Sequence, residues 1–220
     1  MDIEMGTIRS SPFVGVFAVA TDRFVLLPRS MEAKERKIAE RLFNVEIIHG
    51  SFANCALLGV LAVGNSNGIV VSDIVEQREI DEMKRGGLRI KKVPGITALG
   101  NMIECNDKKA FCSKSIPKNV RETIEEVLEV DCIEATVAGN ELVGSSMVLT
   151  NKGFIANPLI SEKEFKHIEK ETGLHGTMAT ANFGDKFVGN SIIANSNVAL
   201  AGIHTSGHEL MRIDDGLCGR

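Results

Sequence analysis

The segment VGSSMVLTNKG, residues 143–153, carries the pattern that decides the fold of this chain. It opens on an apolar residue followed by glycine, and the same pair recurs as Val14-Gly15, Leu58-Gly59, Leu99-Gly100 and Val188-Gly189. Successive glycines lie 44, 41, 44 and 45 residues apart, so five copies account for the 220 residues. Self-similarity at such a period indicates one supersecondary unit that is repeated along the chain.

A second marker accompanies the glycines. Asn65, Asn106, Asn151 and Asn195 follow the glycine of their copy by six or seven residues, and Thr21 holds this place in the first copy. Asparagine tolerates positive φ and hydrogen-bonds nearby backbone, which is typical of tight turns. We therefore interpret these residues as turn residues and assign them no function.

The fourth copy predicts the order of elements within a unit. Its apolar run, residues 143–149, predicts a buried strand that contains the glycine. A turn at 150–153 and a second strand at 154–157 follow. Ser161 and Glu164 form a capping box that opens a helix to about residue 171. Residues 176–179 predict a last strand, so each unit reads strand, strand, helix, strand.

The ends of the chain predict how the units are joined. The fifth copy has a capping box at Ser206 and a helix but no final strand, whereas residues 3–9 alternate like a strand and belong to no unit. If residues 3–9 complete the fifth unit, the sheets close into a ring without an open edge. We therefore expect one domain, 1–220, of five units (13–56, 57–97, 98–141, 142–186 and 187–220), with helices outside. The glycines should lie near the axis, where backbones approach closely.

Composition narrows the class of protein. The sequence is 44% hydrophobic, lacks any apolar stretch long enough to cross a membrane, and starts without a basic leader segment. Its five cysteines are scattered without a CxxC pair, which argues against a zinc site or a disulfide framework. These features predict a cytoplasmic protein with reduced thiols and no membrane partner.

Charge and aromatic content bear on nucleic acid. The formal net charge is −4, the longest basic run is Lys91-Lys92, and the chain has neither tryptophan nor tyrosine. Proteins that hold RNA mainly through phosphates need a dense basic face, and base stacking needs aromatic side chains. We therefore expect little direct RNA contact and a partner that is itself a basic protein.

Three glycine segments, TALGN at 97–101, VGSSMVLTNKG at 143–153 and VGNSIIANS at 188–196, resemble the translation initiation factor 6 family of ribosome anti-association factors. The resemblance covers the whole chain and implies the α+β pentein fold, a five-fold pseudosymmetric ring of ββαβ units. It also implies a monomer that binds the intersubunit face of the large ribosomal subunit, chiefly through a ribosomal protein of the L14 type near the sarcin–ricin loop. The family is linked to large-subunit maturation as well. The chain ends at Arg220 without the long tail of eukaryotic members, so the archaeal form is more similar.

The residue after each glycine is our candidate for partner contact. These positions hold Val16, Val60, Asn101, Ser145 and Asn190, which we expect to gather at one end of the ring. In the family, the asparagine of the Ala-Leu-Gly-Asn motif is tied to large-subunit binding, which the resemblance carries to Asn101. The alternative is that Asn101 only hydrogen-bonds a neighbouring turn. His204 departs from the family, which usually has Asp at that position.

A second class of function remains open at this point. Pentein enzymes that modify guanidines use a cysteine near the C-terminus with a histidine and carboxylates, and Cys218 with His204 and His208 superficially fits. However, Cys218 lies at a chain end that we expect to fray, and no insertions between units could cover a substrate. We therefore expect no enzyme activity, no cofactor and no metal.

Overall fold

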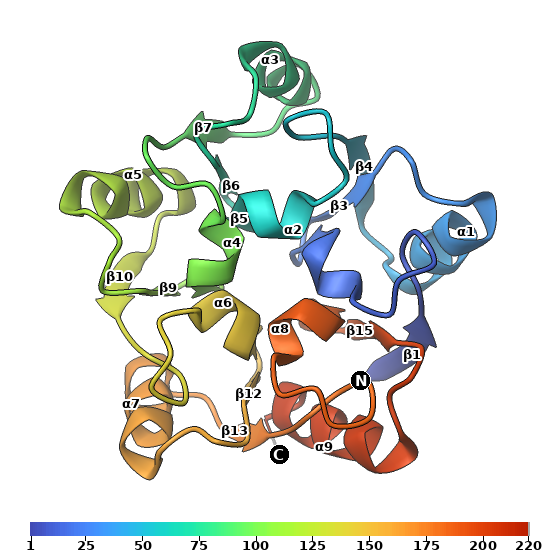
Figure 1. The fold of residues 1–220 in the computed structure, drawn as a ribbon, viewed down its shortest axis with the longest axis vertical. Helices are drawn as coiled ribbons and strands as arrows, with labels where there is room; N and C mark the ends of the chain where they lie inside the picture. The colour runs from blue at the N-terminus through green and yellow to red at the C-terminus, as the bar shows by residue number, and fades with distance from the viewer. Residues whose placement is uncertain (220) are drawn as a thin grey trace.

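Five units surround a central axis in the computed structural model, which describes residues 1–219 (Figure 1). Each unit contributes one three-stranded sheet to the wall of the ring, one outer helix, and one short helical turn beside the axis. The α+β ring with helices outside that the repeats predicted is therefore confirmed.

The order of strands is the same in all five sheets. The first and second strands of a unit pair antiparallel, and the third pairs parallel with the second. The strands are β2 (Val19–Ala20), β3 (Phe24–Pro28) and β4 (Glu46–Gly50); β5 (Ala62–Asn65), β6 (Gly68–Val71) and β7 (Ile90–Lys92); β8 (Ile103–Cys105), β9 (Lys109–Cys112) and β10 (Asp131–Glu134); β11 (Met147–Leu149), β12 (Phe154–Ala156) and β13 (Gly176–Met178); and β14 (Ile192–Ala194), β15 (Val198–Gly202) and β1 (Asp2–Gly6).

The outer helices begin and end close to where their capping signals predict. They are α1 (Ala33–Leu42), α3 (Gln77–Arg85), α5 (Lys118–Leu128), α7 (Glu162–Thr172) and α9 (Gly207–Leu217). Both predicted capping boxes form, with Ser161 accepting from the Glu164 amide and Ser206 from the Glu209 amide. Pro117 precedes the first helical residue of α5 instead of lying inside the first turn.

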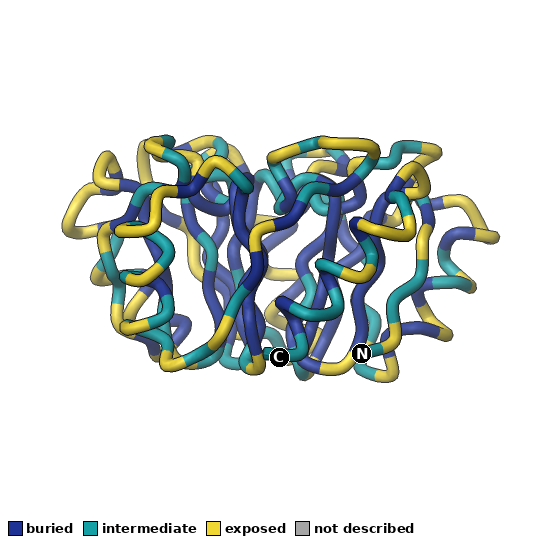
Figure 2. Tube along the Cα trace, turned by 90° about the horizontal axis from the view of Figure 1, so that it is seen from below, coloured by how far each residue is buried: buried dark blue, intermediate teal, exposed yellow. Residues whose placement is uncertain are grey.

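The N-terminal strand closes the ring, as predicted. β1 pairs parallel with β15, Asp2 lying opposite Val198 and Gly6 opposite Gly202. The strand covers residues 2–6 rather than 3–9, because residues 8–11 turn sharply, with Arg9 and Ser10 at positive φ. Figure 2 shows buried strands through the middle of the ring and exposed loops around its edges, with both chain ends marked on the same side.

The predicted strand around each glycine is wrong in its first half. The glycines lie in single helical turns beside the axis, which we call the inner turns: η1 (Val14–Val16), α2 (Leu58–Leu61), α4 (Leu99–Met102), α6 (Val143–Ser146) and α8 (Val188–Ser191). The strand starts only after the turn, at Met147 in the fourth unit. A short apolar run that is buried on all sides fits a helix or a strand equally well, so periodicity could not separate them.

The glycines lie where backbones meet, as expected. A Cβ added to Gly59, Gly100, Gly144 or Gly189 would clash with the carbonyl oxygen of the glycine in the preceding unit, and one on Gly15 would clash with Gly189. The five contacts form a closed circle around the axis. We call this side of the ring, formed by the inner turns and the loops that precede them, the glycine face.

The polar turns occupy the opposite end and do more than close hairpins. Thr21, Asn65, Asn106, Thr150 and Asn195 are the equivalent residues, all buried, so Asn151 lies one position beyond the marker that we assigned to it. The side-chain amide of Asn106 donates to the Thr150 carbonyl at 3.0 Å, and that of Asn195 to Thr21 at 3.2 Å. These bonds join neighbouring units around the ring.

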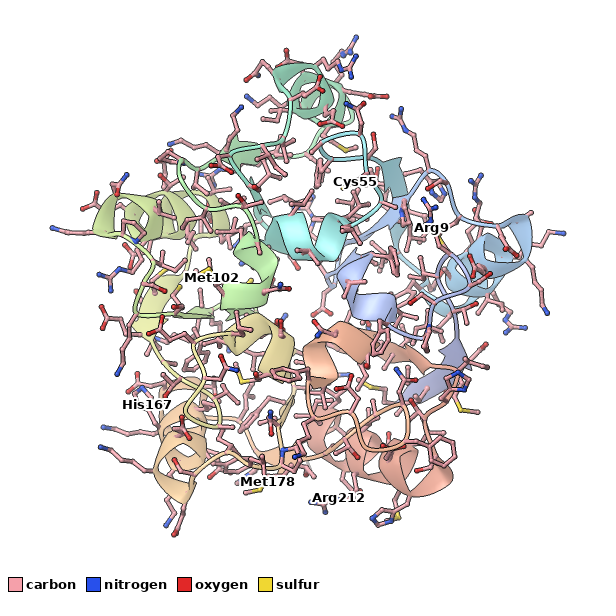
Figure 3. The ribbon with its side chains drawn as sticks, viewed as in Figure 1. Arg9, Cys55, Met102, His167, Met178 and Arg212 are labelled. Carbon is pink, nitrogen blue, oxygen red and sulfur yellow. The ribbon has the colours of Figure 1, made fainter. Side chains whose placement is uncertain are left out.

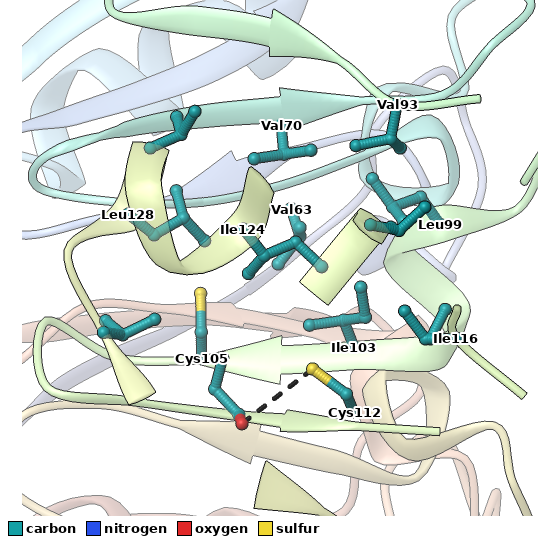
Figure 4. Close-up of a cluster of buried hydrophobic side chains, with 14 of the residues drawn as sticks. Val63, Val70, Val93, Leu99, Ile103, Cys105, Cys112, Ile116, Ile124 and Leu128 are labelled. Carbon is teal, nitrogen blue, oxygen red and sulfur yellow. Dashed lines mark hydrogen bonds between the residues drawn. The ribbon is translucent and has the colours of Figure 1, made fainter. Parts of the chain in front are cut away.

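The hydrophobic core is divided among the junctions between units. Figure 4 shows one such cluster, in which Val63 and Val70 of the second unit meet Ile103, Ile124 and Leu128 of the third. A single unit therefore cannot bury its apolar face alone, which is the usual condition of repeat proteins.

Candidate docking face

The glycine face brings the five predicted contact residues together. Val16, Val60, Asn101, Ser145 and Asn190 each follow an axial glycine, and each inner turn contacts the next around the ring. Figure 3 marks Met102, the neighbour of Asn101, on the inner turn α4 close to the axis. Ser145 is only 4% exposed and lies beneath the surface, whereas the other four are partly exposed.

The two asparagines of the glycine face have free side chains. The backbone amide of Asn101 donates to the Ala98 carbonyl at 3.2 Å, and that of Asn190 to Phe187 at 2.9 Å, so backbone bonds alone hold these turns. Neither side-chain amide has a hydrogen-bond partner among residues 1–219. The alternative that Asn101 bonds a neighbouring turn is therefore not what the structure shows, and its amide is available to a partner.

Apolar side chains that the sequence analysis did not single out surround these asparagines. The residue just before each inner turn is apolar in all five units, and Phe13, Leu57 and Leu142 are 44%, 40% and 38% exposed. Ala98 and Phe187 hold the same place in the third and fifth units. Phe183, on a neighbouring loop of the fifth unit, is 82% exposed. The signal was an apolar residue two positions before every axial glycine.

Buried carboxylates fix the loops that lead into the inner turns. In the fourth unit, Glu164 accepts hydrogen bonds from the Thr136 hydroxyl at 2.7 Å and from the Gly139 amide at 3.0 Å. These bonds and those from Ser161 outweigh the effect of burial and lower the pKa of Glu164 to about 2. Glu35, Glu79 and Glu209 hold the equivalent loops of the first, second and fifth units.

The third unit is the exception. The residue equivalent to these carboxylates is Val120, and its loop contains Pro94 and Gly95 in place of the bonded residues. The loop beside Asn101 is therefore the one that no carboxylate of this set anchors.

A cavity of about 90 Å³ lies on the axis behind the inner turns. The five glycines line it, together with Val19, Val63, Val148 and Ile193, each four residues after a glycine. Glu104 occupies the same place in the third unit and accepts a hydrogen bond from the Leu149 amide at 2.8 Å. Burial raises the pKa of Glu104 to about 8. At neutral pH this carboxyl is mostly protonated.

The structure does not assemble the cysteine-based alternative. Cys218 ends helix α9, where its Sγ lies 3.3 Å from both Asp214 Oδ1 and the Met1 amine, so this end is held and not frayed as expected. His208 lies at the other end of α9, about 15 Å away at 1.5 Å of rise per residue. Exposed His204 lies near His208, at the start of α9. The nucleophile and its candidate bases are therefore apart.

Two searches of residues 1–219 complete the description of the molecule. They find no helix of the length and apolarity that crossing a membrane needs. They also find no group of three His, Cys, Asp or Glu residues placed to hold a metal ion.

Comparison with solved structures gives distant similarities. A dimethylarginine dimethylaminohydrolase in an adduct with S-methyl-L-thiocitrulline is 11% identical, with a TM-score of 0.49 over 94% of this chain and 74% of its own. An agmatine deiminase from C. jejuni is 15% identical, with a TM-score of 0.36 over 56% of this chain and 50% of its own.

Comparison with known sequences is closer. The translation initiation factor 6 of Pyrococcus horikoshii is 35% identical, over 99% of both chains, and that of Picrophilus torridus is 36% identical, over 98% of this chain and 99% of its own. The sequence profile of the eIF-6 family matches residues 3–216. The chain belongs to the eIF-6 family.

Proposed function

We propose that this protein binds the large ribosomal subunit through its glycine face and thereby prevents association with the small subunit. Its relatives are named translation initiation factors, and the match extends over nearly the whole chain. The observation that carries the proposal is the pair of free amides, Asn101 and Asn190, among exposed apolar residues on one side of the ring. A role in large-subunit maturation is compatible with the same contact.

The composition of the face favours a protein as the direct partner. Exposed aromatic and aliphatic side chains with a few polar groups between them are typical of the centre of protein–protein interfaces. The glycine face contains such residues in Phe13, Leu57 and Leu142. A ribosomal protein of the L14 type is the partner that we propose, bound by a cytoplasmic monomer without a cofactor.

The ring provides occlusion without a moving part. The backbone contacts between the axial glycines and the bonds from Glu35, Glu79, Glu164 and Glu209 fix the inner turns and most of their loops. A face that is rigid before binding loses little conformational freedom on docking. A docked ring then keeps the small subunit away by its bulk alone, and nucleotide hydrolysis is not required.

The substitution Asn101→Ala tests the proposed contact. Truncation in a desolvated interface leaves a partner group unpaired, which costs about 1–3 kcal/mol, or roughly tenfold to a hundredfold in affinity. Co-sedimentation with purified large subunits measures the affinity, and the melting temperature reports stability. Asn119→Ala, on the exposed start of α5, is the matched control and should change neither.

A subunit-joining assay tests the consequence. Adding the protein to separated subunits should lower the yield of joined ribosomes, and Asn101→Ala should weaken this effect in proportion to its loss of affinity. Failure of the wild-type protein to sediment with large subunits would refute the proposed function. Unchanged affinity of Asn101→Ala would instead move the contact away from α4.

A further inference from the structure

Helix α1 presents a row of positive side chains on the outer wall of the ring. Lys34, Lys37 and Arg41 are exposed and follow one another at intervals of three and four residues, so they lie on one face of the helix. With Ala33 and Ile38 they line an open hollow of about 460 Å³. We call Lys34, Lys37 and Arg41 the basic row.

The charge of the basic row is largely uncompensated. Lys34 and Lys37 form no ion pair with any residue from 1 to 219, and only Arg41 is paired, with Glu4 at 2.5 Å. On the flank of the same helix, the Nε of Arg36 is buried and has no hydrogen-bond partner in the described chain. A buried unpaired donor next to free ammonium groups indicates a surface that still lacks its acceptors.

The remainder of the molecule makes this row unusual. The net charge is −4, and the outward side of α5 carries four exposed carboxylates: Glu122, Glu125, Glu126 and Glu129. Positive charge is therefore gathered on the first unit while the third is acidic. Such a distribution steers a polyanion toward one side of the ring and repels it from the other.

We infer that the basic row binds the phosphate backbone of RNA. This inference rests on the proposed function and adds to it a second contact, to ribosomal RNA, outside the glycine face. Ammonium groups act as point charges toward phosphates, which suits a contact that follows the backbone without reading bases. The row was invisible as a run in the sequence because its members are three and four residues apart.

The position of α1 fits such a contact. The helix begins beside the glycine face, since Glu35 in its first turn accepts bonds from Arg9 and Ser10 on the loop that leads into η1 (Figure 3). From there the basic row runs down the outer wall of the ring, rising about 10 Å between Lys34 and Arg41. A ring docked by its glycine face can therefore carry an RNA strand along this side.

A membrane is the weaker candidate for the same charge. Helices that lie on membranes insert large apolar side chains into the lipid. The apolar side of α1, Ala39 and Leu42, is already buried against the ring, which leaves Ile38 as the one sizeable apolar side chain beside the basic row. Phosphates presented by RNA need no such insertion.

The test compares two double variants of equal charge. Lys34→Gln/Lys37→Gln removes two cations from α1, and Lys163→Gln/Lys170→Gln removes two exposed cations without ion pairs from α7. Affinity for purified large subunits is measured over a range of salt concentration. Each phosphate contact adds about 0.7–0.9 to the slope of log affinity against log salt, so the α1 variant should lose about 1.5 units. The α7 variant should keep the wild-type slope.

Protein-free large-subunit RNA and phosphatidylserine vesicles separate the outcomes. The α1 variant should bind this RNA at least about threefold more weakly than the α7 variant does at low salt, and the wild type should not float with the vesicles. Equal slopes and equal RNA affinities for the two variants overturn the inference while leaving the glycine-face contact intact. Vesicle binding that only the α1 variant loses assigns the row to a lipid surface and also overturns it. Loss of ribosome binding by the wild type refutes the proposed function instead, and the RNA arm then still decides the chemistry of the row.

Discussion

The carbonyl oxygen of Gly100 lies so close to the Cα of Gly144 that a Cβ on Gly144 would come well inside 3.0 Å of it. The same relationship holds between the other axial glycines, which are related by five-fold pseudosymmetry. Because backbone atoms stand on both sides of each contact, no side chain can rotate away to make room. Glycine is required here by space, not by φ.

Gly144→Ala should therefore lower the free energy of unfolding by about 2–4 kcal/mol, the usual cost of overpacking a rigid site or more. Urea unfolding at neutral pH measures the change. Gly207→Ala is the control, since a Cβ at Gly207 meets no atom within 4 Å and its φ is not positive. Equal midpoints for the two variants would show that the inner turns can separate at little cost.

Deletion of residues 1–6 should destabilise the ring by several kcal/mol, because β15 loses its parallel partner and the sheet acquires an open edge. Thermal unfolding followed by circular dichroism measures the loss. The truncated protein should also aggregate more readily, since an exposed strand edge can pair with another chain. A truncated protein that melts with the parent would mean that β1 contributes little to closure.

Glu164→Gln should remove charge-assisted bonds to the loop at residues 137–140 and lower stability at pH 7 by about 1–3 kcal/mol. The pKa of Glu164 is about 2 in the folded protein, below its ordinary value of 4.5. Its contribution is therefore present above pH 4.5 and lost as the pH falls toward 2. Stability curves between pH 2 and 7 should be flatter for the variant. Glu162→Gln, on the exposed side of the same helix, should change little.

Glu104 should act in the opposite sense and in a different pH range. Its pKa rises from 4.5 to about 8 on folding, so the folded protein binds more protons than the unfolded chain between these values. Stability due to this group is full below pH 4.5 and is lost as the pH rises through 8, by about 2–4 kcal/mol. Glu104→Gln should remove this slope and be at least as stable as the parent at pH 8.5. A wild-type curve that is flat from pH 5 to 8.5 would show that the carboxyl is charged in the cavity.

Much of the fold could be predicted because the repeat is visible in the sequence. The glycine period sets the number of units, and the missing last strand with the unassigned residues 3–9 predicts closure. The inner turns could not be predicted, since Val143 to Leu149 is buried throughout and shows neither a helical nor an alternating pattern. The marker Asn151 was misassigned for a related reason, as Thr150 makes the same turn bonds as asparagine does elsewhere.

The candidate site was predicted less completely. The positions after the glycines could be named, but not that Ser145 would be buried while Asn101 kept a free amide. Burial depends on how adjacent inner turns pack, which a single sequence does not reveal. Phe13, Leu57 and Leu142 were missed because apolar residues beside a predicted core strand are ordinarily buried. The basic row was missed because its charges become neighbours only once α1 has formed.

The pairing of β1 with β15 also sets an order of events during synthesis. Asp2 is among the first residues to leave the ribosome, yet its partner Val198 is made only when the fifth unit is nearly finished. Chains fold from the N-terminus as they emerge, so the four earlier units can dock on one another while β1 waits as an unpaired strand. Closure of the ring is then the last and least local step, and it converts a vulnerable open arc into a particle without strand edges.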